Sequence, residues 1–212
     1  MRIATRKLSL GLIALGSAAV LTGAGSTVGA TQAAAQSASR VNKASVQRMI
    51  AGWPQASRMA AMDMMQKYGP PQEATASMLM WRNNGPWKWT KVSRETIPHS
   101  FPMPHPDLLE QAIDYQVPLG KYDDVARYDG SVIVERTKGQ ISARCDKEGA
   151  NFLAINLTHD VATGRRSVDQ ARTYYAAAIK RFMSTKQMDP YMQRLQFQAS
   201  RQNTRDPDRT VI

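Results

Sequence analysis

The chain has 212 residues, with 28 Lys and Arg against 17 Asp and Glu, a formal net charge of +11 and one cysteine. A single cysteine excludes an intramolecular disulfide, so stability has to come from a packed core. The sequence contains no phosphate-binding glycine loop and no G-x-S-x-G, H-E-x-x-H or Cys-x-x-Cys motif, which argues against the enzyme classes that those motifs define.

The N-terminus is predicted to be an export signal. Basic residues precede an uncharged apolar run from Leu8 to Val20, and small residues of the kind that signal peptidase accepts follow it. The apolar run is shorter than the roughly 20 residues that a transmembrane helix needs. We therefore predict a signal peptide over residues 1–35, cleaved after Ala35 or Ala30, a periplasmic or secreted protein, and no stable transmembrane segment after cleavage.

The rest of the chain has the length of one domain. Residues 36–52 begin with a run rich in Ser, Ala and Gln and are predicted to be a flexible linker. A single α+β domain is predicted over 53–199, followed by a flexible basic tail over 200–212. Within the domain, apolar residues at helical spacing predict a first helix over 55–68, with its methionines in the core.

Two runs of β-favouring residues, 77–82 and 87–94, flank the dipeptide Asn84-Gly85, which is typical of tight hairpin turns. The hairpin carries three tryptophans that the alternation of a strand can place on one face. Such a row is usually buried under a helix, and the alternative is an exposed platform that stacks on sugar rings. The candidate glycan-binding residues are Trp81, Trp87 and Trp89.

Residues 97–106 contain four prolines and are predicted to be an extended connector rather than a central strand. His99, His105 and Asp107 lie in or beside it and have the donor types of a metal site. No compact ligand spacing supports such a site, so we predict no metal and no cofactor. A short helix is expected over 108–115.

The remaining sequence indicates a second hairpin followed by helices. The predicted elements are a turn or short helix at 123–129, strands at 131–136 and 140–144 with Gly139 at the turn, a helix through 152–161 capped by Asp146, a helix from a capping box at Ser167, and a restart at Asp189-Pro190. The predicted fold class is therefore α+β, a small antiparallel sheet from two β-hairpins covered by helices, with a helical C-terminus.

Cys145 is the candidate catalytic residue. It is predicted to lie where a strand meets a helix N-terminus, next to Arg144, and both features stabilise a thiolate. A nucleophile also needs a base within hydrogen-bond reach, whereas His159 would lie roughly 20 Å further along the same helix. An envelope hydrolase or thiol enzyme that uses Cys145 is therefore the second functional hypothesis, beside a structural role for this thiol.

The C-terminal quarter carries most of the positive charge, with ten Lys and Arg against four Asp and Glu after residue 162. For an exported chain this favours an anionic envelope component or a protein partner and makes nucleic acid unlikely. The leading hypothesis is a non-catalytic exported binding module, ahead of the thiol enzyme and the glycan-binding module. Its candidate contact residues are Arg165, Arg166, Arg172, Lys180 and Arg181.

Residues 62–89, with Lys67-Tyr68-Gly69-Pro70-Pro71 followed by a hairpin with tryptophans, resemble the SmpA/OmlA type of outer-membrane assembly module. This resemblance implies a small α+β envelope protein. Residues 81–87 and 142–148 are similar to segments of uncharacterised exported bacterial proteins, which again implies export.

Overall fold

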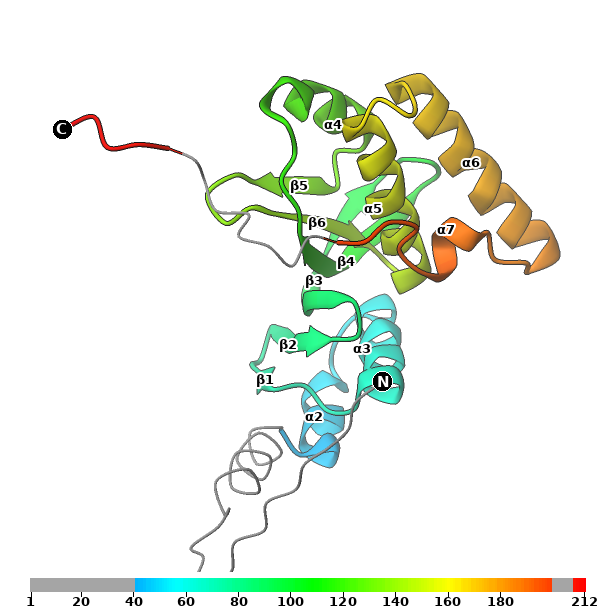
Figure 1. The fold of residues 1–212 in the computed structure, drawn as a ribbon. Helices are drawn as coiled ribbons and strands as arrows, with labels where there is room; N and C mark the ends of the chain where they lie inside the picture. Colours follow the sequence, from blue (N-terminus) through cyan, green and yellow to red (C-terminus); the bar gives the residue numbers. More distant parts are fainter. Residues whose placement is uncertain (1–40, 200–207) are drawn as a thin grey trace, which may run out of the picture. The chain divides into compact units, whose positions relative to one another are not determined.

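The protein is an α+β protein built on one six-stranded antiparallel sheet with strand order β1-β2-β3-β4-β6-β5 (Figure 1). The computed structural model describes residues 41–199 and 208–212. The predicted signal peptide, the first five residues of the predicted linker and residues 200–207 of the predicted tail lie outside the described residues.

The elements follow the chain in a mixed order. The strands are β1 (Glu73–Ala74), β2 (Met78–Asn84), β3 (Trp87–His99), β4 (His105–Asp114), β5 (Val132–Glu135) and β6 (Gln140–Cys145). The helices are α2 (Lys43–Ile50), α3 (Gln55–Tyr68), α4 (Tyr122–Tyr128), α5 (Glu148–Ala162), α6 (Val168–Thr185) and α7 (Pro190–Gln193), with a 3-10 turn, η1, at Leu119–Lys121.

The folded domain begins before residue 53, so the predicted linker is wrong from residue 43 onward. Asn42 caps α2 by accepting hydrogen bonds from two backbone N–H groups. Val46 and Ile50, one helical turn apart, are fully buried against the neighbouring helix and strands. Burial of these two residues overrides the polar composition of the segment.

Helix α3 has the predicted bounds, but its buried face differs from the predicted one. Met64 and Met65 are in the core, whereas Met59 and Met62 are exposed. The buried stripe instead uses the small residues Ala60 and Ala61, which allow the helix to approach the sheet closely. The prediction that all the methionines pack in the core is therefore correct for only two of these four.

The predicted helix over 108–115 is wrong, because this segment is the central strand β4. It pairs with β3 on one side and β6 on the other, and so joins the two predicted hairpins into one sheet. Every residue from Asp107 to Ile113 is buried. A strand buried on both faces loses the alternation that identifies strands, and its apolar run then also fits a helix.

The proline-rich connector is shorter than predicted. Pro98 lies opposite Pro106, and His99 lies opposite His105, at the end of the β3–β4 ladder. Prolines are tolerated there because the ladder is ending and few backbone donors are required. As a consequence, both histidines belong to one hairpin end.

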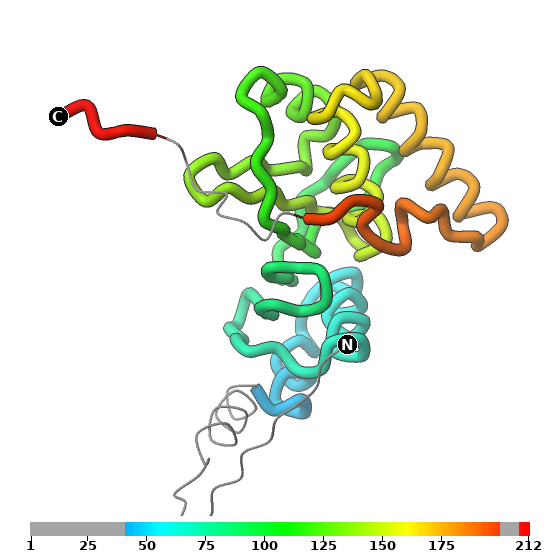
Figure 2. Tube along the Cα trace, viewed as in Figure 1, coloured from blue at the N-terminus to red at the C-terminus, as the bar shows by residue number. Residues whose placement is uncertain are grey.

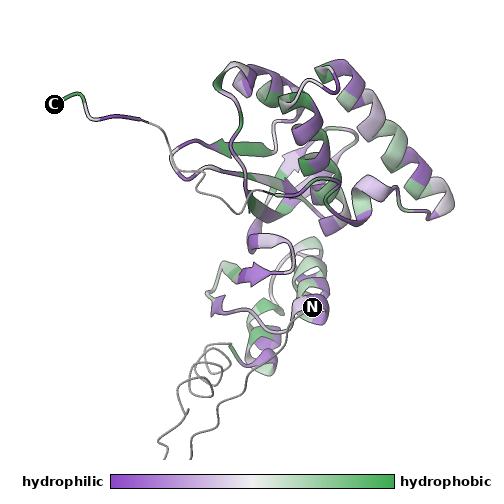
Figure 3. Cartoon of the chain, viewed as in Figure 1, coloured by the Kyte–Doolittle hydropathy of each residue, from purple (hydrophilic) through white to green (hydrophobic). Residues whose placement is uncertain are grey.

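Helices α3 and α5 cover the same face of the sheet, as Gln111 of β4 shows. Its amide contacts Met64 of α3 and Glu148 of α5. Figure 3 shows hydrophobic residues gathered on α5 and on β5, and these two elements contact each other. The opposite face carries polar groups, including a Lys91–Glu110 ion pair.

The C-terminal half largely follows the prediction. Gly139 has a positive φ of 58° in the β5–β6 turn, Ser167 forms the capping box of α6, and Asp189 caps α7. Asp146 does not cap α5, whose N-cap is Lys147 without a side-chain hydrogen bond. After α7 the chain turns back along α5 (Figure 2), where Phe197 stacks on His159 with 4.1 Å between ring centroids.

None of the helices in the described part of the chain combines the length and the apolar character that crossing a bilayer requires.

Candidate functional site

Polar side chains converge at the end of the β3–β4 hairpin. We call His99, His105, Asp107, Asp129 and Ser131 the His–Asp cluster. The register of the hairpin places the two histidines opposite each other, with ring centroids 5.0 Å apart. Asp107 follows His105 by two residues on β4 and therefore points to the same side of the strand. Asp129 and Ser131 come from the loop between α4 and β5.

His105 uses both of its ring nitrogens within the hairpin. Its Nδ1–H donates to the carbonyl of Met103 at 2.8 Å. Its Nε2 lies 3.3 Å from Oδ1 of Asp107, whose side chain is 1% exposed. Among the described residues, this Asp107 oxygen is one of a few buried side-chain polar atoms that have no hydrogen-bond partner.

The second histidine approaches the other oxygen of the same carboxylate. Ser131 Oγ donates to Asp107 Oδ2, and His99 Nδ1 lies 3.1 Å from that hydroxyl and 3.7 Å from the carboxylate oxygen. His99 Nε2 faces Asp129 Oδ1 at 3.8 Å. The His–Asp cluster therefore places two imidazoles around one buried carboxylate.

Cys145 lies beside the cluster, at the junction of β6 and α5 that the sequence predicts. The thiol is 5% exposed and donates to Asp146 Oδ1 at 3.6 Å. Burial raises the pKa of Cys145, and the opposing effect of His105 does not cancel that rise. The pKa of His105 rises to about 11, chiefly because the Asp107 carboxylate beside the ring favours the charged imidazolium.

These values argue against a ready thiol–imidazole dyad. A general base has to be unprotonated at the working pH and within reach of the nucleophile. His105 is held protonated, and both of its nitrogens face other partners. His159, at the far end of α5, binds Tyr115 instead.

A pocket of about 330 Å³ opens over Cys145 and His105. We call it the methionine pocket, because four methionines from the hairpin end and from the α6–α7 region line it. They are Met103, Met183, Met188 and Met192. Ile179, Phe182 and Tyr175 complete the wall on α6, and the exposed Lys147 stands at the start of α5.

A second hollow of about 450 Å³ shares part of this wall. Met103, Ile179 and Met183 line both spaces, and Lys180 lines only the second. We call the second space the side hollow. Together the two spaces form an apolar site with a lysine beside each part.

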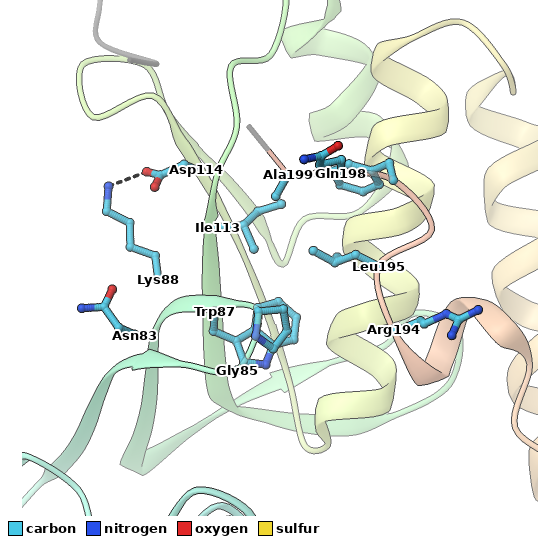
Figure 4. Close-up of a pocket in the computed structure, with 12 residues that line it drawn as sticks. Asn83, Gly85, Trp87, Lys88, Ile113, Asp114, Arg194, Leu195, Gln198 and Ala199 are labelled. Carbon is cyan, nitrogen blue, oxygen red and sulfur yellow. Dashed lines mark hydrogen bonds and ion pairs between the residues drawn. The ribbon is translucent and has the colours of Figure 1, made fainter. Parts of the chain in front are cut away.

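A larger hollow, of about 790 Å³, lies elsewhere, between the β2–β3 turn and residues 194–199 (Figure 4). Its charged residues include Lys88 and Asp114, which pair with each other. The wall ends at Ala199, the last residue before 200–207, and the space does not reach the His–Asp cluster.

The alternative of an exposed tryptophan platform is wrong, and the favoured burial holds for Trp81 and Trp87. Trp81 is fully buried and donates to the carbonyl of Gly69, and Trp87 is 1% exposed and packs on Phe152 of α5. Trp89 is half-buried beneath Lys91. Trp81 and Trp87 even belong to different hydrophobic clusters, so burial under helices, the usual fate of such residues, applies here.

The predicted anionic-contact residues differ in their surroundings. Arg166 pairs with the buried Asp160, and Arg172 donates to the Tyr128 carbonyl and stacks on Phe101. Arg165, Lys180 and Arg181 are exposed. Arg165 precedes α6 and Lys180 lies near its end, roughly 20 Å away at the usual helical rise.

No family model, curated protein or solved structure matches the chain.

Proposed function

We propose that this protein is an exported module that binds an anionic amphiphile. The apolar chain of the ligand would occupy the methionine pocket and the side hollow. The observation that carries the proposal is an apolar pocket of about 330 Å³ next to a second apolar hollow, each with an exposed lysine beside it. Protein pockets that bind small molecules are mostly apolar, and a few polar groups in them fix the orientation of the ligand.

The composition of the walls supports an aliphatic chain as ligand. Methionine is unbranched and adapts to chains of varied length and curvature. Lys180, one of the predicted anionic contacts, stands beside the side hollow, and Lys147 stands beside the methionine pocket. We therefore propose that the ligand's carboxylate or phosphate contacts one of these lysines. The proposal keeps the anionic envelope component expected from the sequence as the partner but places its binding site at the two hollows.

Calorimetric titration with laurate tests this function. Monolaurin, which has the same chain and an uncharged glycerol ester, separates the contribution of the chain from that of the charge. We expect saturable laurate binding and weaker monolaurin binding. Ile179→Trp fills space shared by both hollows and should abolish binding of both ligands.

Charge reversal at the rim gives the matched control. Lys180→Glu should weaken laurate binding by up to about fivefold, the range of an exposed charge contact of up to about 1 kcal/mol, and leave monolaurin binding unchanged. Lys43→Glu alters an exposed lysine on α2, a helix that lines neither hollow, and should change neither affinity. Equal laurate affinity in the wild type and in Ile179→Trp would refute the proposed site.

A further inference from the structure

We propose that the His–Asp cluster binds one divalent first-row transition metal ion through His99, His105 and Asp107. One ligand atom from each residue lies within 4.8 Å of the other two. Zinc and the neighbouring first-row transition metals bind imidazole and carboxylate ligands. Three protein ligands leave the fourth tetrahedral coordination position open. This inference does not depend on the proposed amphiphile binding.

The buried carboxylate gives a second and independent reason. Asp107 Oδ1 is buried and accepts no hydrogen bond in the described part of the chain, although it points at His105 Nε2. Buried polar atoms nearly always have a partner. A metal ion bound between the carboxylate and the imidazole would replace the Nε2 proton of His105 and coordinate both groups.

The spacing fits a small ion. Two ligands at zinc distances of about 2.0–2.1 Å and a tetrahedral angle stand about 3.4 Å apart. The separation between His105 Nε2 and Asp107 Oδ1 is 3.3 Å. The longest separation, up to 4.8 Å, closes by about 1.4 Å when the set surrounds a tetrahedral ion.

The surrounding hydrogen bonds orient the ligands. The bond from His105 Nδ1–H to the Met103 carbonyl leaves Nε2 as the nitrogen that faces Asp107. Ser131 holds the second carboxylate oxygen and contacts His99. Metal-binding histidines and carboxylates are typically supported in this way.

The test is calorimetric titration of chelator-stripped protein, without a histidine tag, with zinc chloride. We expect one zinc ion per chain and an increase in melting temperature on binding. Asp107→Asn and His105→Gln should each lower affinity by more than the roughly 10–100-fold expected for Ser131→Ala, which removes a supporting contact.

The chain offers a matched control, because its third histidine lies outside the cluster. His159→Gln should bind zinc within twofold of the wild type. His99→Gln, whose side chain is 19% exposed, tests the ligand set with a smaller disturbance of the core if Asp107→Asn fails to fold. Absence of stoichiometric zinc binding in the wild type, or unchanged binding in folded His99→Gln and His105→Gln, would overturn the proposal. Laurate titration in the presence of a chelator separates this result from the proposed function.

Discussion

Glu148 and Trp87, which are 61 residues apart, are joined by a hydrogen bond of 2.7 Å from the indole Nε1 to Oε1 of the carboxylate. The same oxygen accepts from Tyr68 at 2.5 Å and Gln111 at 3.2 Å. Donors from α3, β3 and β4 therefore meet at the first residue of α5. This carboxylate links the part of the sheet under α3 to the part under α5.

Replacing Glu148 with Ala should destabilise the fold by about 2–3 kcal/mol, because it leaves several partly buried donors without an acceptor. Urea unfolding measures this change. Glu73→Ala is the control, since its ion pair with Arg82 is exposed on both sides and should contribute within about 1 kcal/mol. Equal losses in the two variants would contradict the linking role of Glu148.

Glu148 should also make stability depend on acidity. Burial on its own raises the pKa of Glu148, but hydrogen bonds from Lys67, Tyr68 and Trp87 outweigh it and hold that pKa below its ordinary value. The resulting stabilisation is complete above the unfolded pKa of about 4.3 and is lost as pH falls through the lower folded pKa. We expect the free energy of unfolding in urea, measured between about pH 3 and about pH 7, to fall less steeply with decreasing pH in Glu148→Gln than in the wild type. An identical slope would exclude this linkage.

Arg166 should be structural rather than available to a partner. Its guanidinium pairs with the buried Asp160 and donates to Tyr191 at 3.2 Å. Arg166→Ala leaves a buried carboxylate without its cation and should cost about 3 kcal/mol in urea unfolding. Arg165→Ala removes an exposed group 3.9 Å from the same carboxylate and should cost less than about 1 kcal/mol. The reverse order of the two losses would be incompatible with these contacts.

Cys145 should behave as a buried, unactivated thiol. Because burial raises its pKa, alkylation by a maleimide in chelator-containing buffer should have a pH midpoint above the ordinary value of about 8.5. The measurement is clean because the chain has no other cysteine. A midpoint below that value would restore the thiol-enzyme hypothesis.

The elements that were predictable from sequence carry strong local signals. Asn84-Gly85 marks the first hairpin, Gly139 the second, and Ser167 the start of α6, and each effect acts within a few residues. Strand β4 was not predictable in this way, since its identity depends on pairing with β3 and β6, which are distant in sequence.

The sequence analysis named His99, His105 and Asp107 as possible metal ligands but set them aside for the same reason. His99 and His105 read as two residues of a proline-rich connector, and only the β3–β4 pairing makes them neighbours. Asp129 and Ser131 arrive from a separate loop. The one local signal was the short stretch that contains both histidines and Asp107. Once 105–107 is recognised as part of a strand, His105 and Asp107 are expected to point to the same side. The placement of Cys145 was predictable, because a strand-to-helix junction is a local feature.

Protection of Cys145 from alkylation by laurate tests the proposed function most directly, because this thiol lines the methionine pocket. We expect laurate to slow the maleimide reaction in proportion to its occupancy of the wild-type protein, with no further effect in Ile179→Trp. A reaction rate that stays the same at saturating laurate would show that the ligand does not occupy the methionine pocket.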